Sequence, residues 1–282
     1  MIVVNYLGQL GNNLFQYAFG RILAEELNYK MFCHPIPDFP NTASAVPGMI
    51  HMFPEKTIPG HIVDISSLTG DRKLDQKIIL NGFFQRYEYY KDHKEKIKEW
   101  FKLDRKDIGQ TENDIIMHIR LGDNVSTFSD NNPFIMPPEY YEKALENTEF
   151  EKLYICTDSP DHDFIKKFSK YDPIMTAQSA INDFKILGSF NKIIMSQSTF
   201  SWWAAWLSEA TEIYTPVPKP GNNKLINEWS IGRPDIATFV DDEERYKYIK
   251  EPLYVLNTIN NISSLQHEEQ KNYFNLARRK KY

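Results

Sequence analysis

The chain has 282 residues, of which 41% are hydrophobic and 25% charged, as in a folded globular protein. Its 33 basic and 38 acidic residues give a net charge of −5, which argues against a nucleic-acid-binding protein. No apolar run reaches the roughly 18 residues of a membrane-spanning helix, and the N-terminus lacks the basic and apolar regions of a signal peptide.

The first part of the chain alternates short apolar runs with helical patterns, which is typical of β-α units. The elements expected there are a strand at Ile2–Tyr6, a loop at Leu7–Asn12, a helix at Leu14–Leu27, an irregular segment at Asn41–Asp71, a strand at Lys77–Asn81 and an amphipathic helix at Tyr89–Phe101. The polar segment Asp104–Asn113 has the length of a connector between lobes.

A second α/β series follows this connector. Its expected strands are Ile115–Arg120, Lys152–Thr157, Lys192–Ser196 and Glu212–Thr215. A polar loop runs through Pro138, and the expected helices are Glu139–Asn147, Asp161–Lys170, Asn182–Phe190 and Ser201–Ala210. The highly charged segment Tyr246–Tyr282 is also predicted to be helical.

These patterns predict an α/β protein of two Rossmann-like lobes, whose parallel sheets face a central cleft. The predicted boundaries are 1–111 for the N-terminal lobe, 112–245 for the C-terminal lobe and 246–282 for a charged helical tail. In such sheets ligands bind beyond the carboxyl ends of the strands, so the residues at those ends are the candidates for function.

The first such end is the glycine turn after Ile2–Tyr6. Gly8 and Gly11 permit a tight turn and close approach by a ligand, and the following helix presents free N–H groups. The spacing G-x-x-G is not the dinucleotide fingerprint, and the lysine of a P-loop is missing. An ordinary βα turn is the alternative interpretation.

The second end is the stretch "IIMHIRLGD", Ile115–Asp123. His118 and Arg120 point to the same face of the strand, because side chains alternate. The planar donor group of an arginine at a strand end suits a phosphate. An edge strand with an exposed arginine and a core histidine is the alternative interpretation.

The third end is a hydroxyl-rich turn that leads into a tryptophan-rich helix. Hydroxyls and free amides at a helix N-terminus make an anion site, whereas simple capping by Thr199 or Ser201 needs only one hydroxyl. The hydroxyl residues are Ser196, Ser198, Thr199 and Ser201. Trp202, Trp203 and Trp206 lie at helical spacing, which favours core packing over sugar-binding platforms.

A fourth strand ends at Asp158. Its carboxylate can accept hydrogen bonds from a ribose or a base. Alternatively, Asp158 or Ser159 caps the helix that follows.

Together these stretches resemble the α-1,2-fucosyltransferases, over most of the chain from Gly8 to about Trp229. The stretches that carry the resemblance are Gly8–Ala18, Gly82–Gln85, His118–Asp123, Asp158 with its neighbour Ser159, and Ser198–Leu207. Four positions depart from the family pattern, in which Leu121 is usually arginine, Asn13 glutamine, Thr199 serine and Ser159 acidic. Strand alternation turns Leu121 away from Arg120, so a core-facing role at that position is compatible with activity.

The resemblance implies a GT-B fold and inverting transfer of L-fucose from GDP-β-L-fucose to the 2-hydroxyl of a terminal galactose. The donor would lie mainly on the C-terminal lobe and the acceptor mainly on the N-terminal lobe. Residues expected to contact the donor are Gly8, Gly11, His118, Arg120, Asp158, Ser198, Thr199, Phe200 and Ser201.

The catalytic residues expected from the resemblance are Arg120, Asp123 and Asn12. Arg120 would stabilise the diphosphate leaving group together with the hydroxyl-rich turn. Asp123 is the candidate general base, because the Gly122 turn places it at the cleft; the alternatives are that it orients Arg120 or binds acceptor hydroxyls. Asn12 would meet the donor or acceptor from the opposite lobe. Gln85 and Asn13 are expected to bind the acceptor.

No metal and no cofactor are expected, and GDP-L-fucose acts as a co-substrate. Asp161-His162-Asp163 matches the D-x-D pattern of metal-dependent transferases. However, it falls in the first turn of a predicted helix, where the helix dipole favours acidic residues.

Two other functions are compatible with the sequence: a GT-B transferase that uses another nucleotide sugar, and a non-catalytic nucleotide-sugar or glycan-binding protein. With two cysteines and no export signal, the protein is expected in the cytoplasm. The basic tail Arg278, Arg279, Lys280 and Lys281 is interpreted as solvated, with weak contact to an anionic membrane surface as the alternative.

Overall fold

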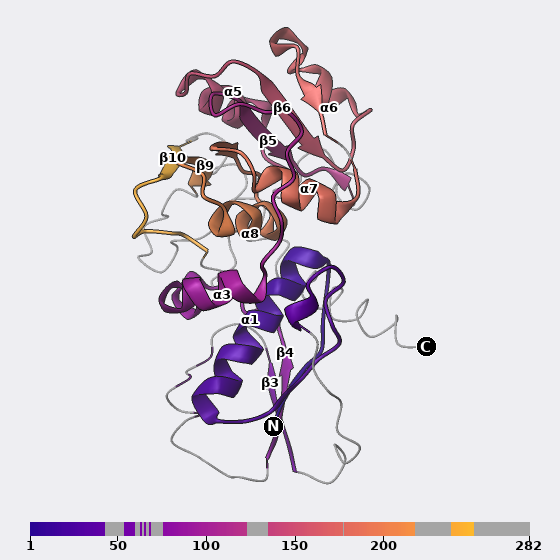
Figure 1. Ribbon diagram of the computed structural model, residues 1–282, viewed down its shortest axis with the longest axis vertical. Coiled ribbons are helices and arrows are strands. Elements are labelled where there is room, and N and C mark those ends of the chain that lie inside the picture. The colour runs from indigo at the N-terminus through magenta and orange to yellow at the C-terminus, as the bar shows by residue number, and fades with distance from the viewer. Residues whose placement is uncertain are drawn as a thin grey trace, which may run out of the picture.

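The computed structural model describes residues 1–42, 54–59, 63, 65, 68, 76–122, 135–176, 178–217 and 238–250. These residues form two lobes, one above the other along the long axis of Figure 1. The described strands of each lobe pair in parallel, in the order β2-β1-β4-β3 in the first and β10-β9-β8-β5-β6-β7 in the second. The predicted α/β architecture of two lobes with parallel sheets is therefore confirmed.

The elements of the first lobe are β1 (Ile2–Val4), α1 (Leu10–Leu27), β2 (Met31–Phe32), β3 (Glu55–Pro59), β4 (Lys77–Asn81) and α3 (Lys94–Trp100). Strand β4 matches its predicted bounds. Strand β3 lies inside the segment predicted to be irregular, so that prediction is wrong there. The reason is that β3 is an edge strand whose Glu55, Lys56 and Thr57 are exposed, which leaves no apolar pattern to detect.

Two helix predictions of the first lobe need correction at their N-termini. Helix α1 begins at Leu10 and includes residues predicted to be a loop. The predicted helix Tyr89–Phe101 is shorter, because two 3-10 turns, Tyr87–Tyr89 and Lys91–His93, precede α3.

The elements of the second lobe are β5 (Ile115–Ile119), α5 (Pro138–Glu146), β6 (Leu153–Thr157), α6 (Asp163–Lys166), β7 (Ile174–Met175), α7 (Ala180–Leu187), β8 (Lys192–Ile194), α8 (Thr199–Leu207), β9 (Glu212–Val217) and β10 (Tyr246–Lys250). All four predicted strands are present. Helix α6 has four residues rather than the predicted ten, and a 3-10 turn at Ser169–Tyr171 and the unpredicted strand β7 follow it.

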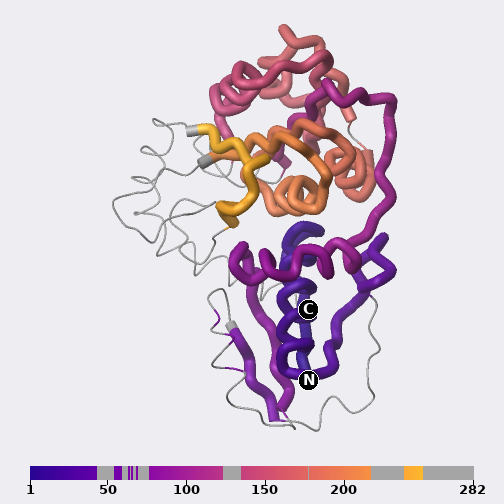
Figure 2. The backbone as a smooth tube through the Cα atoms, turned by 60° about the vertical axis from the view of Figure 1, so that its left-hand side comes forward, coloured from indigo at the N-terminus to yellow at the C-terminus, as the bar shows by residue number. Residues whose placement is uncertain are grey.

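The last described segment corrects a further prediction. Tyr246–Lys250 was expected to be helical but forms β10, which pairs in parallel with β9. The second lobe therefore extends past the predicted boundary at residue 245, and the rest of the predicted tail lies outside the described residues. The predicted boundary at 111 and 112 falls between α3 and β5, in the segment that runs along one side of the molecule from lobe to lobe in Figure 2.

A shared aromatic core joins the two lobes. The ring of Phe15 on α1 lies 4.8 Å from that of Trp203 and 4.9 Å from that of Trp202, both on α8. Trp202, Trp203 and Trp206 are at most 1% exposed. The core-packing interpretation of these tryptophans is therefore confirmed, since such side chains offer no platform for a sugar.

An ion-pair network ties the segment before β10 to both lobes. Glu243 accepts from Lys94 of α3 at 2.5 Å and from the indole N–H of Trp206 at 3.0 Å. Arg245 donates to the carbonyls of Trp206 and Ser208 at the end of α8, at 3.0 and 2.7 Å. Helices α3 and α8 are thus held next to each other between the two sheets, as Figure 1 shows.

Candidate active site

The candidate site begins where the chain order reverses in the second sheet. Strand β5, the first of this lobe, lies between β8 and β6. Connections on either side of such a switch point diverge and leave a crevice at the carboxyl ends of the strands. The residues after β5 and β8 were predicted to be functional, and the structure brings these two segments together.

The side chains of β5 and of the residues that follow it alternate between two faces of the sheet. Met117, Ile119 and Leu121 belong to a core cluster with the residues of α5, whereas Ile116 belongs to the core shared with the first lobe. Leu121 is 1% exposed, which confirms the predicted core-facing role. The opposite face carries His118 and Arg120 toward the switch point.

Arg120 forms an ion pair with Asp158, which follows the adjacent strand β6. Oδ1 of Asp158 accepts hydrogen bonds from the N–H groups of Leu121 and Gly122, both at 3.0 Å. The side chains of Arg120 and Asp158 are 27% and 30% exposed, so both still reach the surface. Asp158 therefore orients the arginine and its turn, and its predicted contact with ribose or base stays a prediction.

The turn after β5 needs glycine at position 122. Its φ is +32°, and a β-carbon there would collide with the Arg120 guanidinium and the Asp158 carboxylate. The hydroxyl of Ser159 also accepts from the N–H of Gly122, at 3.2 Å. Neither Asp158 nor Ser159 caps α6; His162 does so through its ring nitrogen, so the capping alternative is wrong.

His118 is buried and links the two strand ends. Its Nδ1 lies 2.7 Å from the hydroxyl oxygen of Ser196, and its ring centroid lies 5.3 Å from that of Phe200. Burial, and next the charge of Arg120, lower the pKa of His118 to about 3. At neutral pH the ring is therefore uncharged, so Arg120 supplies the positive charge here and His118 does not.

The hydroxyl-rich turn makes contacts within the protein. Ser198 is the N-cap of α8 and accepts from the N–H of Phe200 at 3.2 Å, so the expected caps Thr199 and Ser201 are wrong. Ser201 is buried and donates to the carbonyls of Ser196 and Ser198, both at 3.2 Å. Their predicted contacts with the donor stay predictions.

Asn12 connects the two lobes. Its Oδ1 accepts from Nε2 of Gln85 at 2.8 Å and from the hydroxyl of Thr199 at 3.0 Å. The starts of α1 and α8 thus meet at Asn12, and its predicted contact with the donor or acceptor stays a prediction. Gly8, in the turn before α1, lies beside the Asn12 side chain.

Gly11 has a packing reason that sequence reasoning missed. A β-carbon at this position would lie 2.5 Å from the backbone nitrogen of Phe200 and the carbonyl carbon of Thr199. Real carbon atoms do not approach so closely, so only glycine lets the start of α1 contact the start of α8. A donor contact of Gly8 or Gly11 stays a prediction.

Gln85 is presented by a strained residue. Phe84 has φ +51°, which is uncommon for a residue with a side chain. Its ring stacks on Phe19 at 4.3 Å, and its carbonyl accepts from the hydroxyl of Tyr90 at 2.5 Å. These contacts stabilise the unusual backbone conformation of Phe84, and this conformation places Gln85 within hydrogen-bonding distance of Asn12.

The hydrogen-bonding roles of Gln16 and Ser196 near the site were not predicted. Gln16 is fully buried, and its amide accepts from the N–H of Leu7 at 2.9 Å and donates to the Leu7 carbonyl at 3.3 Å, which fastens the glycine turn. A glutamine inside an apolar helix pattern was the available signal. No signal in the sequence indicates that Ser196 is the partner of His118, because the pairing of β5 with β8 decides which residues meet there. Asn13, an expected acceptor contact, has a buried Oδ1 without a hydrogen-bond partner among the described residues.

Some predicted features lie outside this geometry. Asp123 and the basic tail Arg278–Lys281 lie outside the described residues. Asp163 of the D-x-D stretch pairs with Lys166 at 2.6 Å. Within the described part of the chain, no three histidine, cysteine or acidic side chains gather as a metal site would need, and no helix is long and apolar enough to cross a membrane.

Comparison with known proteins identifies a protein family and a similar protein. The model of a protein family described as glycosyl transferase family 11 matches residues 56–233. The chain is also 26% identical, over 271 residues, to an alpha-1,2-colitosyltransferase of Escherichia coli, covering 78% of this chain and 92% of that protein. The family match spans the Gly82–Gln85 element and the ends of β5, β6 and β8.

Proposed function

Because this chain belongs to glycosyl transferase family 11, we propose that it transfers L-fucose from GDP-β-L-fucose to the 2-hydroxyl of a terminal galactose, with inversion and without a metal ion. The donor binds mainly on the second lobe, and the galactose-terminated glycan mainly on the first. The polar residues at the ends of β5, β6 and β8 support the first placement, and the Asn12–Gln85 pair supports the second.

One observation carries the proposal: Arg120 stands at the end of β5, the strand that borders the switch point, and is held there by Asp158. His118, two residues earlier, contacts Ser196 and Phe200 on the side of α8. Breaking the bond between sugar and phosphate leaves a diphosphate whose negative charge grows toward the transition state. A guanidinium held in place stabilises that charge without reorganising, and the N-terminus of α8 adds the positive end of a helix dipole.

Neighbouring groups prepare Arg120 for this role. Asp158 restricts the guanidinium to one orientation, and its hydrogen bonds to the Leu121 and Gly122 amides hold the turn. His118 remains neutral, so it does not compete with Arg120 for the phosphates, and its ring supports Phe200. These contacts favour diphosphate binding at Arg120.

The acceptor hydroxyl has to lose a proton. Asp123 is the general base in our proposal, because it follows directly after the Gly122 turn. Asn12 and Gln85 form one hydrogen-bonded pair at the lobe junction, where an acceptor sugar would approach the donor. Asn13, whose Oδ1 lacks a described partner, is proposed as a further acceptor contact.

Transfer of colitose is a second candidate, favoured by the relative named alpha-1,2-colitosyltransferase. Colitose lacks one hydroxyl that L-fucose carries. An enzyme that hydrogen-bonds this hydroxyl discriminates strongly against the sugar without it, whereas the reverse preference is weaker. Competition between the two GDP-sugars therefore separates the candidates.

The test is acceptor-dependent release of GDP from GDP-L-fucose in the presence of EDTA, over a panel of β-galactosides, with GDP-colitose as the second donor. Release with a galactoside, together with an α-1,2 linkage in the product, supports the proposal. Release from GDP-colitose alone assigns the second candidate. A binding protein without activity would bind GDP-fucose and release nothing with any acceptor.

Arg120→Ala tests the residue that carries the proposal. We expect a loss of about 10²–10³-fold in kcat, as when one preorganised donor to a developing charge is removed. Arg105→Ala, at an exposed arginine in the connector between the lobes, is the matched control and should retain full activity. Near-normal turnover by Arg120→Ala with an unchanged Tm would refute the assignment.

A further inference from the structure

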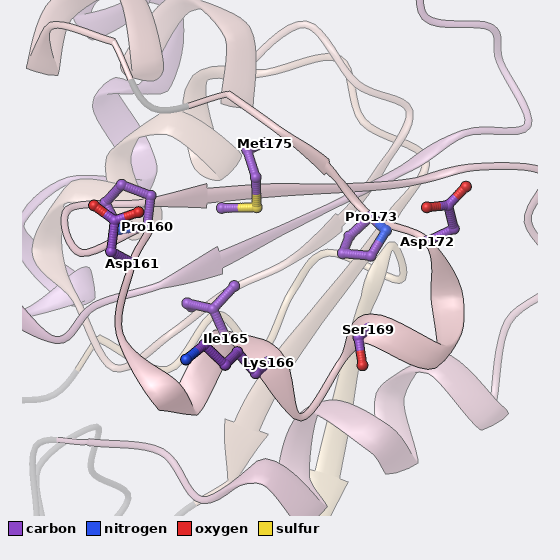
Figure 3. A pocket seen from close by; sticks show the side chains of 8 residues that line it. All are labelled: Pro160, Asp161, Ile165, Lys166, Ser169, Asp172, Pro173 and Met175. Carbon is purple, nitrogen blue, oxygen red and sulfur yellow. The ribbon is translucent and has the colours of Figure 1, made fainter.

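A pocket of about 530 Å³ lies at the edge of the second sheet, between α6 and β7. In Figure 3, Pro160 and Asp161 lie at one end, Asp172 and Pro173 at the other, and α6 forms one wall. Met175 of β7 points into it from the opposite side. None of these lining residues was predicted to contact the donor.

The pocket begins close in the chain to the proposed diphosphate site. Pro160 comes two residues after Asp158, so their Cα atoms are at most about 7 Å apart. Asp158 is the residue that holds Arg120. A ligand with its phosphates at Arg120 therefore needs to extend by about 7 Å past Asp158 to reach Pro160, a residue that lines the pocket.

Sheet topology indicates which part of the donor lies there. The order β7-β6-β5-β8 places β5 first, β6 beside it and β7 outermost. In nucleotide-binding sheets with this order, the phosphates lie at the turn after the first strand, and an acidic residue after the second strand faces the ribose. The base then lies farther out, toward the third strand, which here is β7.

We propose that the pocket between α6 and β7 holds the guanine base of the donor nucleotide and that Asp161 reads its Watson–Crick edge. This inference rests on the proposed GDP-sugar donor and adds the residues that select guanine. Guanine presents an N1–H and a 2-amino group side by side, and one carboxylate accepts hydrogen bonds from both. Adenine and uracil do not offer this pair of donors.

The walls of the pocket suit a flat aromatic ring. Pro160, Ile165 and Met175 supply apolar surface on its sides. Met175 and its neighbour Ile174 are 38% and 42% exposed, and they are the large hydrophobic side chains that remain exposed in the described part of the chain. A base lying against Met175 would remove apolar surface from water, and the polarisable thioether sulfur makes favourable contacts with rings.

Binding of four nucleoside diphosphates to the protein and its variants tests the inference. Wild-type protein should bind GDP about tenfold or more tightly than IDP, which lacks only the 2-amino group, and more tightly than ADP or UDP. In Asp161→Ala the GDP-to-IDP ratio should fall to near one. In Met175→Ala all four affinities should fall by a similar factor. This substitution removes the contact with the face of the base and keeps the contact of Asp161 with its edge.

Asp163→Ala is the matched control, since Asp163 is an exposed acidic residue two positions away that pairs with Lys166 and does not line the pocket. It should keep the wild-type ratio. If Asp161→Ala keeps the preference for GDP, or wild-type protein has none, the pocket assignment is wrong while fucose transfer can still be measured independently. If no nucleoside diphosphate binds, both this inference and the proposed donor fail.

Discussion

In each lobe a glycine-containing turn follows the first strand, but the two turns have different structural roles. After β1, the turn and the start of α1 make uncharged contacts to the other lobe: Gly11 packs against the start of α8 and Asn12 accepts from Thr199, while Asn12 also accepts from Gln85 of its own lobe. After β5, the turn is built around a charge, with Arg120 held by Asp158.

The comparison of the two turns shows that a glycine-rich turn before a helix does not by itself indicate a ligand site. Free amides and absent side chains suggest a ligand in both lobes, yet at Gly11 the neighbouring backbone of α8 already accounts for the glycine. At Gly122 the space is needed by an ion pair that our proposal places in the reaction. The three experiments below test this contrast between a turn that joins lobes and a turn that carries charge.

Leu121→Arg should have the largest effect on stability. It introduces the arginine usual at this position in the resembling family, but the side chain would enter the core formed by Met117, Ile119 and α5. An unpaired buried charge costs about 3–5 kcal/mol, so we expect a large fall in the free energy of unfolding, measured by urea denaturation. Leu121→Met, which conserves volume, should cost less than about 1.5 kcal/mol. Wild-type stability in Leu121→Arg would mean that the residue faces the site.

Gly11→Ala should have the next largest effect. The added methyl overlaps the backbone of Thr199 and Phe200, and such overpacking typically costs about 1–3 kcal/mol. Because α1 and α8 must separate, kcat should fall together with Tm. Gly188→Ala is the control: its β-carbon would approach α8 no closer than 3.3 Å, at the carbonyl of Ala204, and both quantities should change little. Equal effects of the two substitutions would contradict the close contact at Gly11.

His118→Asn should change how stability depends on acidity. Because the folded protein keeps the pKa of His118 at about 3, below the unfolded value of about 6.5, the unfolded chain binds the proton more readily. Stability is therefore lost as the pH falls from about 6.5 toward 3, by about 2 kcal/mol at pH 5 from this group. Urea denaturation at pH 7.5 and pH 5 should show a smaller difference for His118→Asn than for wild type. An unchanged difference would mean that His118 is not held neutral.

Local patterns in the sequence were sufficient for much of the fold and for part of the site. Apolar runs and alternation located β4, β5, β6, β8 and β9, the face shared by His118 and Arg120, and the inward direction of Leu121. Each of these depends on contacts within a few residues or on the period of a strand. The short strands β2, β3 and β7 were missed because they lie at or near sheet edges, where two to five residues bury too little to form a pattern.

Contacts between distant segments decided the rest. Which carboxylate holds Arg120, which hydroxyl meets His118 and why position 11 is glycine all depend on strand order and on the packing of α1 against α8. No local pattern encodes such pairings, because the partners are from about 40 to nearly 190 residues apart. The sequence therefore specified the chemical groups at the strand ends, and folding specified which of them act on one another.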